Sequence, residues 1–244
     1  MERANILGCG VDLISMEEAV AAIEKMVESG RPHQVITLNA EIIYQAREDA
    51  DLQGIINSAD LVTPDGIGVV WAAGRLGHRS AGRVTGIDLL ERLAARSAQL
   101  GWKVYLLGSA PGVAEAAGRI LQDRYRSLNV VGTHHGYFKP DEVPALLQEI
   151  NHLTPDLLCV ALGAPGQEIW IDHYKEQLGV PVMIGVGGSL DVIGGFKQRA
   201  PELFIKLNLE WFYRLVSEPS RLKRQMVLPR FAMQVIREKY RKSS

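Results

Sequence analysis

The 244-residue sequence contains only two cysteines, Cys9 and Cys159, which lie far apart in separate apolar segments. Neither belongs to a CxxC motif or to a cluster of cysteine and histidine, so disulfide frameworks and zinc sites explain them poorly. The chain also lacks an apolar run near the roughly 18 residues that a membrane-spanning helix needs. Its first residues show neither the basic nor the apolar segment of a signal peptide. We therefore expect a cytosolic protein without a membrane-spanning segment.

Several motifs of catalysis and cofactor binding are missing as well. The sequence has no G-x-S-x-G, which argues against a covalent serine hydrolase. GCG at residues 8–10 is only a fragment of the G-x-G-x-x-G fingerprint, so we reject a dinucleotide cofactor. DAD at residues 49–51 resembles a metal-binding motif of nucleotide-sugar transferases, but it lies in a polar helical stretch with no strand before it. We interpret it as a solvated helix face and expect neither a metal nor a cofactor.

Charge is distributed unevenly, although the net charge is only -1. Residues 1–195 carry 15 Lys and Arg against 24 Asp and Glu, whereas residues 196–244 carry 12 against 4. A basic segment that follows an acidic body indicates an anionic partner, either nucleic acid or a membrane surface. Because no nucleic-acid-binding motif accompanies the charge, we favour the membrane surface and expect no nucleic acid.

Short aliphatic segments alternate with helical patterns along most of the chain. The segments typical of strands buried on both faces are residues 35–39, 60–64, 103–108, 129–134, 156–163 and 181–188. Ser15 and Glu18 have the spacing of a capping box at the start of the first helix. The alternation predicts an α/β fold, a Rossmann-like and largely parallel sheet with helices on both faces. After residue 195 the strands stop, so we divide the chain into a catalytic α/β domain (1–195) and a basic helical appendage (196–244).

Polar residues and glycines follow several of these strands. Ligands of open parallel sheets bind beyond the carboxyl ends of the strands, where the sequence places Thr37, Asn39, Asp65, Gly108, Ser109, Gln167, Gly187 and Gly188. The loops 108–112 and 186–189 let backbone N–H groups approach a phosphate, although tight turns alone also need glycine. Two such loops at one edge of the sheet favour a nucleotide ligand.

Three of the polar residues have both a structural and a functional interpretation. Asp65, in TPDG, either caps the helix that follows or acts as a general base. Arg83 lies between two glycines, where it suits a pyrophosphate but is equally explained as a surface side chain. Gln167 can bind sugar hydroxyls, although helix capping accounts for it as well. The residues alone leave these alternatives open.

The appendage interleaves aromatic and aliphatic residues with basic ones, including Arg214, Arg221 and Arg224. Such an amphipathic basic surface is typical of contact with an anionic membrane, and packing onto the body is the alternative for its apolar half. Apolar helical runs at residues 66–76 and 86–100 are explained by a homo-oligomer interface or by core packing.

Seven segments occur in a distinctive order: TLNAEI (37–42), TPDGIG (63–68), RVTGID (83–88), LGAPGQEIW (162–170), GVGGSLDVIGG (185–195), RAPE (199–202) and EWFYRLVSEPSR (210–221). Together they resemble the WecG/TagA/CpsF glycosyltransferase family over nearly the whole chain. Within it, the sequence looks most similar to TagA-type N-acetylmannosaminyltransferases of wall teichoic acid synthesis. This resemblance is much more specific than any single motif.

The resemblance implies an inverting, metal-independent transfer of N-acetylmannosamine from its UDP derivative to the 4-hydroxyl of N-acetylglucosamine on undecaprenyl diphosphate. Asp65 would deprotonate the acceptor, and countercharge for the departing UDP would come from Arg83, Arg214, Arg221 and Arg224. Thr37, Asn39 and Gln167 would hold the sugars. Gly108, Ser109, Gly187 and Gly188 would receive the UDP.

The same resemblance gives the appendage two functions. It would sit on the inner face of the cell membrane, so that the protein is peripherally associated there, and it would close over the edge of the sheet as a lid. Other branches of the family use UDP-N-acetylmannosaminuronic acid, which leaves the donor sugar open. An epimerase or hydrolase, and a non-catalytic membrane-recruited binding module, are the alternatives in other functional classes.

Overall fold

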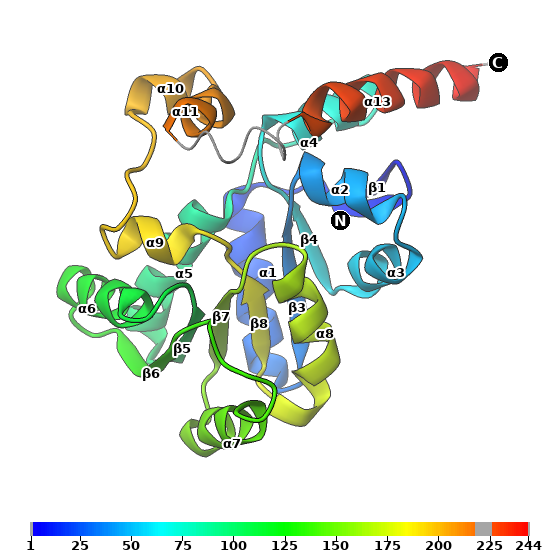
Figure 1. The fold of residues 1–244 in the computed structure, drawn as a ribbon. Helices are drawn as coiled ribbons and strands as arrows, with labels where there is room; N and C mark the ends of the chain where they lie inside the picture. The colour runs from blue at the N-terminus through cyan, green and yellow to red at the C-terminus, as the bar shows by residue number, and fades with distance from the viewer. Residues whose placement is uncertain (1, 218–225, 244) are drawn as a thin grey trace.

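The computed structural model describes residues 2–217 and 226–243, which fold around a central parallel sheet (Figure 1). The strands of this sheet lie in the order β4-β3-β8-β7-β5-β6, and every pairing between them is parallel. Their bounds are β3 (His33–Leu38), β4 (Leu61–Pro64), β5 (Lys103–Gly108), β6 (Asn129–His134), β7 (Leu157–Ala161) and β8 (Val182–Gly185). The predicted α/β class, the parallel sheet and all six predicted strands are confirmed.

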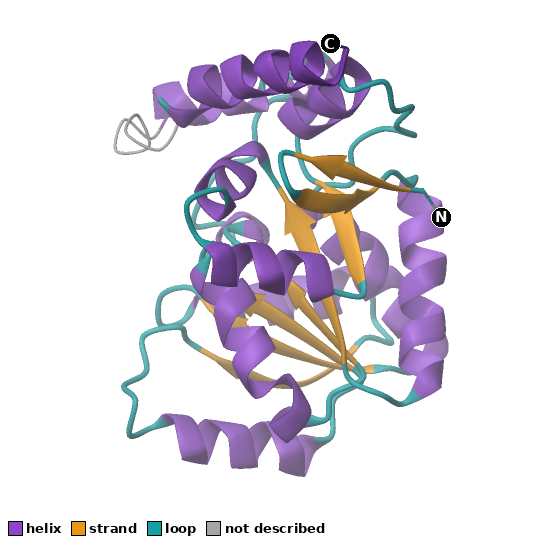
Figure 2. Ribbon diagram, turned by 90° about the vertical axis from the view of Figure 1, so that its right-hand side faces the viewer, coloured by secondary structure: helices purple, strands orange, loops and turns teal. Residues whose placement is uncertain are grey.

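Helices cover both faces of the sheet (Figure 2). Val35 and Ile36, neighbours in β3, are buried in different apolar clusters, because successive strand residues point to opposite faces. One face carries α1 (Met16–Ser29), α5 (Gly86–Leu100), α6 (Val113–Arg124) and α9 (Ser189–Ile193). The other carries α2 (Ala40–Ala46), α3 (Ala50–Ser58), α4 (Ile67–Arg75), α7 (Val143–Leu153) and α8 (Gly166–Leu178).

A capping box accounts for the start of the first helix, and core packing accounts for the apolar runs at residues 66–76 and 86–100. The predicted capping box is present at the start of α1, where Ser15 Oγ accepts from Glu18 N at 3.2 Å and Glu18 Oε2 accepts from Ser15 N at 2.8 Å. Many apolar residues of α4 and α5, such as Val69 and Leu93, are completely buried in the core of this chain. Core packing therefore explains both runs, and a homo-oligomer stays a prediction.

An antiparallel hairpin precedes the sheet and was not predicted from the sequence. It consists of β1 (Arg3–Ile6) and β2 (Cys9–Asp12), joined by Leu7 and Gly8, which both have positive φ angles. The GCG segment thus belongs to a hairpin. Asp12 fixes the hairpin to β4, because its buried carboxylate accepts from Arg3 at 3.0 Å and from Val62 N at 2.8 Å.

The described part of the appendage consists of helices, as predicted. These are α10 (Glu202–Lys206), α11 (Glu210–Ser217) and α13 (Val227–Ser243). Pro229 lies in the first turn of α13, where a missing N–H breaks no helical hydrogen bond. Buried Phe231 and Val235 pack α13 onto α2 and α4 (Figure 1), within the apolar cluster that also contains the hairpin. The basic C-terminal helix is thus anchored to the body by its inner face.

Candidate active site

A cavity of about 1160 Å³ lies beyond the carboxyl ends of the strands. Its walls come from the residues that follow β3, β4, β5, β7 and β8 and from the appendage helices α11 and α13. β5 and β7 are neighbours whose onward connections run in opposite directions, to β6 and to β8, which makes their carboxyl ends a topological switch point. The structure therefore brings most of the predicted site residues to one place.

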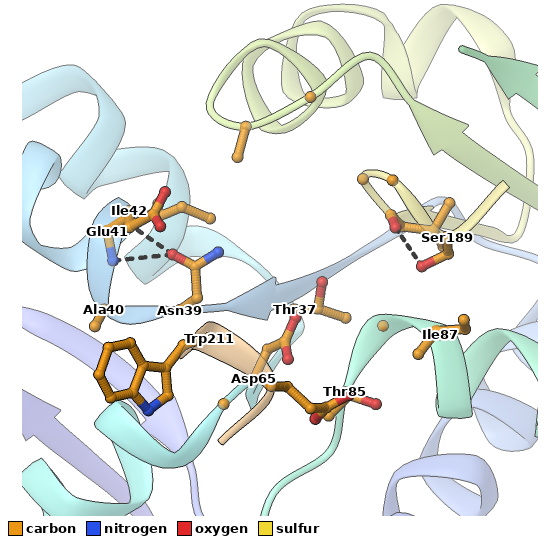
Figure 3. A pocket seen from close by; sticks show the side chains of 18 of the residues that line it. Thr37, Asn39, Ala40, Glu41, Ile42, Asp65, Thr85, Ile87, Ser189 and Trp211 are labelled. Atoms are coloured by element: carbon orange, nitrogen blue, oxygen red, sulfur yellow. Dashed lines mark hydrogen bonds between the residues drawn. The ribbon is translucent and has the colours of Figure 1, made fainter. Parts of the chain in front are cut away.

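Thr37 and Asn39 stand at the end of β3 and line this cavity (Figure 3). The buried Thr37 hydroxyl donates to the Gly185 carbonyl at 3.0 Å, so its oxygen can still accept a hydrogen bond from a ligand. Asn39 caps α2, and its Oδ1 accepts from Glu41 N and Ile42 N, both at 3.0 Å. Both side chains combine a fold contact with a place on the cavity wall.

Asp65 follows β4 and also lines the cavity (Figure 3). Its backbone N–H donates to the Leu38 carbonyl at 2.8 Å, which ties the end of β4 to β3. The next helix starts at Ile67 with Gly66 at its N-cap, so Asp65 does not occupy the cap position. Gly66 has φ 95°, a conformation that glycine adopts easily, and this explains the Asp-Gly pair. The carboxylate is thus placed before the helix, on the cavity wall.

Gln167 joins the loop after β7 to the loop after β8. It lies in the first turn of α8 and is buried. Its Oε1 accepts from Gly187 N at 3.0 Å, and its Nε2 donates to Glu168 Oε1 at 2.8 Å. Gly187 and Gly188 also line the cavity. Gln167 therefore fixes the glycine loop on which a nucleotide was predicted to bind.

The other glycine loop has a different geometry. Gly108 has φ 127°, and a Cβ atom there would overlap the backbone of Ala161, so close packing of β5 against β7 requires the glycine. Gly108 is not among the residues that line the cavity, whereas Ser109 is. The Ser109 hydroxyl donates to Asp191 Oδ2 at 3.0 Å. A contact of Gly108 with UDP stays a prediction.

Arg83 lies on the cavity wall and contacts the appendage. Its guanidinium forms an ion pair with Glu210 of α11 and donates to the Ile205 carbonyl at 3.2 Å. Trp211, next to Glu210, enters the same cavity (Figure 3). Arg214 belongs to α11, while Arg221 and Arg224 lie outside the described residues. The structure thus joins the predicted catalytic arginine to the segment predicted to act as a lid.

Cavity residues that the sequence did not single out include Asp191 and Tyr137. Asp191 lies in α9, directly after the glycine loop, so polar residues one helical turn beyond a strand end would have been a usable signal. Tyr137 follows the edge strand β6 and reaches the cavity because Gly136 N donates to the Ser109 carbonyl at 2.8 Å. No local pattern indicates that long-range contact.

Acidic groups elsewhere in the described part of the chain are not gathered into a metal centre. Across residues 2–217 and 226–243, no group of three or more His, Cys, Asp or Glu side chains is placed to hold an ion. In the DAD segment, Asp49 caps α3, since its Oδ1 accepts from Asp51 N at 3.1 Å and from Leu52 N at 3.0 Å. Both carboxylates are exposed, in agreement with a solvated helix face.

Ser29, His33 and Asp60 form a hydrogen-bonded chain at the opposite end of the sheet. Ser29 Oγ lies 2.8 Å from His33 Nε2, and His33 Nδ1 lies 2.9 Å from Asp60 Oδ1. However, the Ser29 hydroxyl donates to the Met26 carbonyl at 2.8 Å, so its one proton already serves the end of α1. A serine whose proton is held by a backbone carbonyl is not arranged as a nucleophile for His33 to deprotonate. This chain supports the fold.

A large cavity lies at the carboxyl edge of the parallel sheet, and it is lined by a carboxylate, by polar groups able to bind sugar hydroxyls and by a glycine loop. This arrangement is typical of a nucleotide-sugar-dependent transferase. Residues 4–244 match the model of the Glycosyl transferase WecG/TagA/CpsF family, so the chain belongs to this family and is a glycosyltransferase. The predicted resemblance is confirmed.

One curated relative adds detail. The N-acetylglucosaminyldiphosphoundecaprenol N-acetyl-beta-D-mannosaminyltransferase of Bacillus subtilis (strain 168) is 34% identical over 210 residues. The alignment covers 86% of this chain and 81% of the relative. The chain is therefore similar over most of its length to a transferase whose name specifies both the sugar it transfers and the lipid-linked acceptor.

Proposed function

We propose that this glycosyltransferase moves N-acetylmannosamine from UDP-N-acetylmannosamine to the 4-hydroxyl of N-acetylglucosamine on undecaprenyl diphosphate, a step of teichoic acid linkage-unit synthesis. The observation that carries the proposal is the position of Asp65, a carboxylate on the wall of a large cavity and outside the cap position of α4. The name of the Bacillus subtilis relative supports the choice of sugar and acceptor.

In the proposed reaction, Asp65 takes the proton of the acceptor hydroxyl while that oxygen attacks C1 of the donor sugar. The new bond forms on the face opposite the UDP, the bond from C1 to the UDP oxygen breaks with its electrons leaving on UDP, and the sugar carbon inverts. Thr37, Asn39 and Gln167 hold the sugars, and Ser109, Gly187 and Gly188 lie where the nucleotide enters. No metal takes part in this proposal.

The departing UDP gains negative charge, which cationic side chains must stabilise. Arg83 is the described candidate, because it lies on the cavity wall. Its present partner is Glu210, so the donor diphosphate has to displace this carboxylate. We assign Arg214, Arg221 and Arg224 to the same task when the appendage closes over the cavity.

The appendage also has a surface suited to a lipid bilayer. Large apolar side chains are exposed on or directly beside α10, α11 and α13: Leu203, Leu207, Trp211, Phe212, Val216, Met226, Met233, Ile236 and Tyr240, of which Trp211 and Met226 also line the cavity. Exposed basic residues, including Arg230 and Arg237, accompany them on α13. Exposed apolar and cationic side chains together favour an anionic bilayer surface. The membrane-bound acceptor would thus meet the cavity from the side of the appendage. No helix among the described residues is long and apolar enough to cross a bilayer.

The test is release of UDP from UDP-N-acetylmannosamine, measured with and without a lipid-diphosphate N-acetylglucosamine acceptor. In the wild type, release should require the acceptor. Asp65→Asn should lower the rate by about 10²- to 10⁴-fold, the usual contribution of a general base. Asp49→Asn is the matched control, because asparagine also caps helices and Asp49 is not among the cavity-lining residues.

Release that ignores both the acceptor and the Asp65 substitution would contradict the proposed reaction. The same assay with UDP-N-acetylmannosaminuronic acid compares the two donors of the family. Faster turnover of the uronic acid donor would reassign the sugar while leaving the role of Asp65 in place.

A further inference from the structure

Glu168 takes no part in the reaction above, yet its side chain is completely buried. It lies in the first turn of α8, beside the cavity-lining Gln167. Glu168 Oε1 accepts from Gln167 Nε2 at 2.8 Å. Glu168 Oε2 is buried with no hydrogen-bond partner among the described residues. A buried carboxyl group with an unsatisfied oxygen is costly, so its presence calls for a specific explanation.

The hydrogen bonds around Gln167 supply that explanation. A glutamine amide has a donor end and an acceptor end. Here the donor end meets Glu168, and the acceptor end takes the Gly187 N–H at 3.0 Å. Turned by 180°, the amide would present its N–H₂ group to the Gly187 N–H, and the loop would lose its acceptor. The Glu168 carboxyl and the Gly187 N–H therefore together fix which end of the Gln167 amide faces the glycine loop.

Gly185 leaves the space that this arrangement needs. A Cβ atom at Gly185 would lie 2.5 Å from Gln167 Nε2 and 3.0 Å from Glu168 Oε1. On its other side, the Gly185 carbonyl accepts from the Thr37 hydroxyl at 3.0 Å. The loop of residues 185–189 is thus held at two points, by Thr37 at its start and by Gln167 two residues later.

We infer that Glu168 is a positioning residue, which orients the Gln167 amide and so keeps the loop of residues 185–189 in the shape that receives the UDP part of the donor. The identity of the ligand in this inference rests on the proposed function. The mechanical part, from Glu168 through Gln167 to Gly187, rests on the contacts alone.

The raised pKa of Glu168 is compatible with this role. Burial raises the pKa of the Glu168 carboxyl, with the hydrogen bond from Gln167 acting in the opposite direction. In either protonation state the carboxyl keeps an oxygen that accepts from the Gln167 amide, so the raised pKa leaves this contact intact.

The test compares two substitutions of Glu168 by amide hydrogen exchange in the segment 185–190, together with the Kd for UDP and the kcat and KM for the donor. Glu168→Leu removes the acceptor and should speed exchange at Gly187, and raise Kd and KM, by about tenfold, as expected for one lost hydrogen bond. Its kcat at saturating donor should change less. Glu168→Gln keeps an acceptor oxygen and should recover most of the protection and of the KM.

Two further variants control for failure of Glu168→Leu to fold and for general effects of losing a hydrogen-bonded carboxyl group. Gly185→Ala keeps the Glu168 carboxyl but presses a methyl group against the Gln167 amide, at 2.5 Å from Nε2, and against Glu168 Oε1, at 3.0 Å. It should therefore disturb the same contact and reproduce the effects of Glu168→Leu, and it decides the matter if that variant does not fold. Glu149→Leu removes another hydrogen-bonded carboxyl, which accepts from the Tyr105 hydroxyl at 2.7 Å. Glu149 is not a cavity-lining residue. This variant should leave exchange in the loop and the KM unchanged.

Unchanged exchange at Gly187 in folded Glu168→Leu, or in Gly185→Ala where Glu168→Leu does not fold, would overturn the inference. Equal damage in Glu168→Gln and Glu168→Leu would also overturn it, because an acceptor oxygen would then not be what matters. If wild-type protein fails to bind UDP, the proposed function is contradicted, and the exchange comparison still decides the role of Glu168.

Discussion

Glu210 should act as a competitor of the donor for Arg83, and replacing it by glutamine should tighten donor binding. The two side chains form an ion pair between the loop before α5 and the start of α11, and they are only 19% (Arg83) and 14% (Glu210) exposed. Hydrogen bonds to charged groups contribute about 1.5–3 kcal/mol. Partial exposure and the amide that remains in Glu210→Gln reduce this to about 1–2 kcal/mol. The KM for the donor should therefore fall by about 5- to 30-fold.

The assay measures initial rates against donor concentration at saturating acceptor, together with the Kd for UDP. Glu202→Gln is the matched control, since Glu202 pairs with Lys206 at 3.4 Å and the two side chains are 87% and 75% exposed. Such a surface pair contributes little, and its loss should leave the KM unchanged. A KM that stays constant or rises in Glu210→Gln would refute the reasoning, because Glu210 would then not compete with the diphosphate for Arg83.

Two predictions concern stability. Burial raises the pKa of Glu168, so this carboxyl keeps its proton in the folded protein above about pH 4.3, the pH at which a glutamate in the unfolded chain loses it. The contribution of Glu168 to stability is therefore present at low pH and is lost as pH rises through the folded pKa. The Tm of Glu168→Gln minus that of the wild type should therefore increase between pH 4 and pH 8, and a constant difference would contradict the raised pKa. Phe231→Ala removes an anchor that is 2% exposed and should cost about 3–5 kcal/mol. Limited proteolysis should then cut within α13 before the body, whereas uniform cleavage would show that α13 does not depend on this anchor.

The parallel sheet could be predicted because each of its strands is a short apolar run between turn signals. β7, for example, is buried at every position of Leu157–Ala161 and has the sequence of a nearly continuous aliphatic segment. The hairpin β1–β2 was missed although Ala4, Ile6, Cys9 and Val11 alternate as a strand pair should. Its turn begins with Leu7 at φ 53°, whereas the usual signal for such a turn is Asn-Gly or Asp-Gly.

The candidate site, too, could be predicted only in part from the sequence. Thr37, Asn39, Asp65 and Gln167 were found from one rule, that ligands gather at the carboxyl ends of parallel strands. That rule cannot show what else these side chains contact. Glu210 is 127 residues from Arg83, and nothing in the sequence around either residue indicates the pair. The burial of Glu168 depends on the absence of a side chain at Gly185, which only the three-dimensional structure shows.

The packing of α13 on α2 and α4 provides a route by which contact with a bilayer would affect catalysis. Phe231 and Val235 hold the inner side of this helix against α2 and α4. Asn39 is the first cap of α2, and Asp65 stands two residues before α4 begins. A tilt of α13 would therefore displace both helices and change the distance between the Asn39 amide and the Asp65 carboxylate. Docking on a lipid surface would then reach the reacting groups through α2 and α4, in addition to any contact made by the α13 side chains that line the cavity.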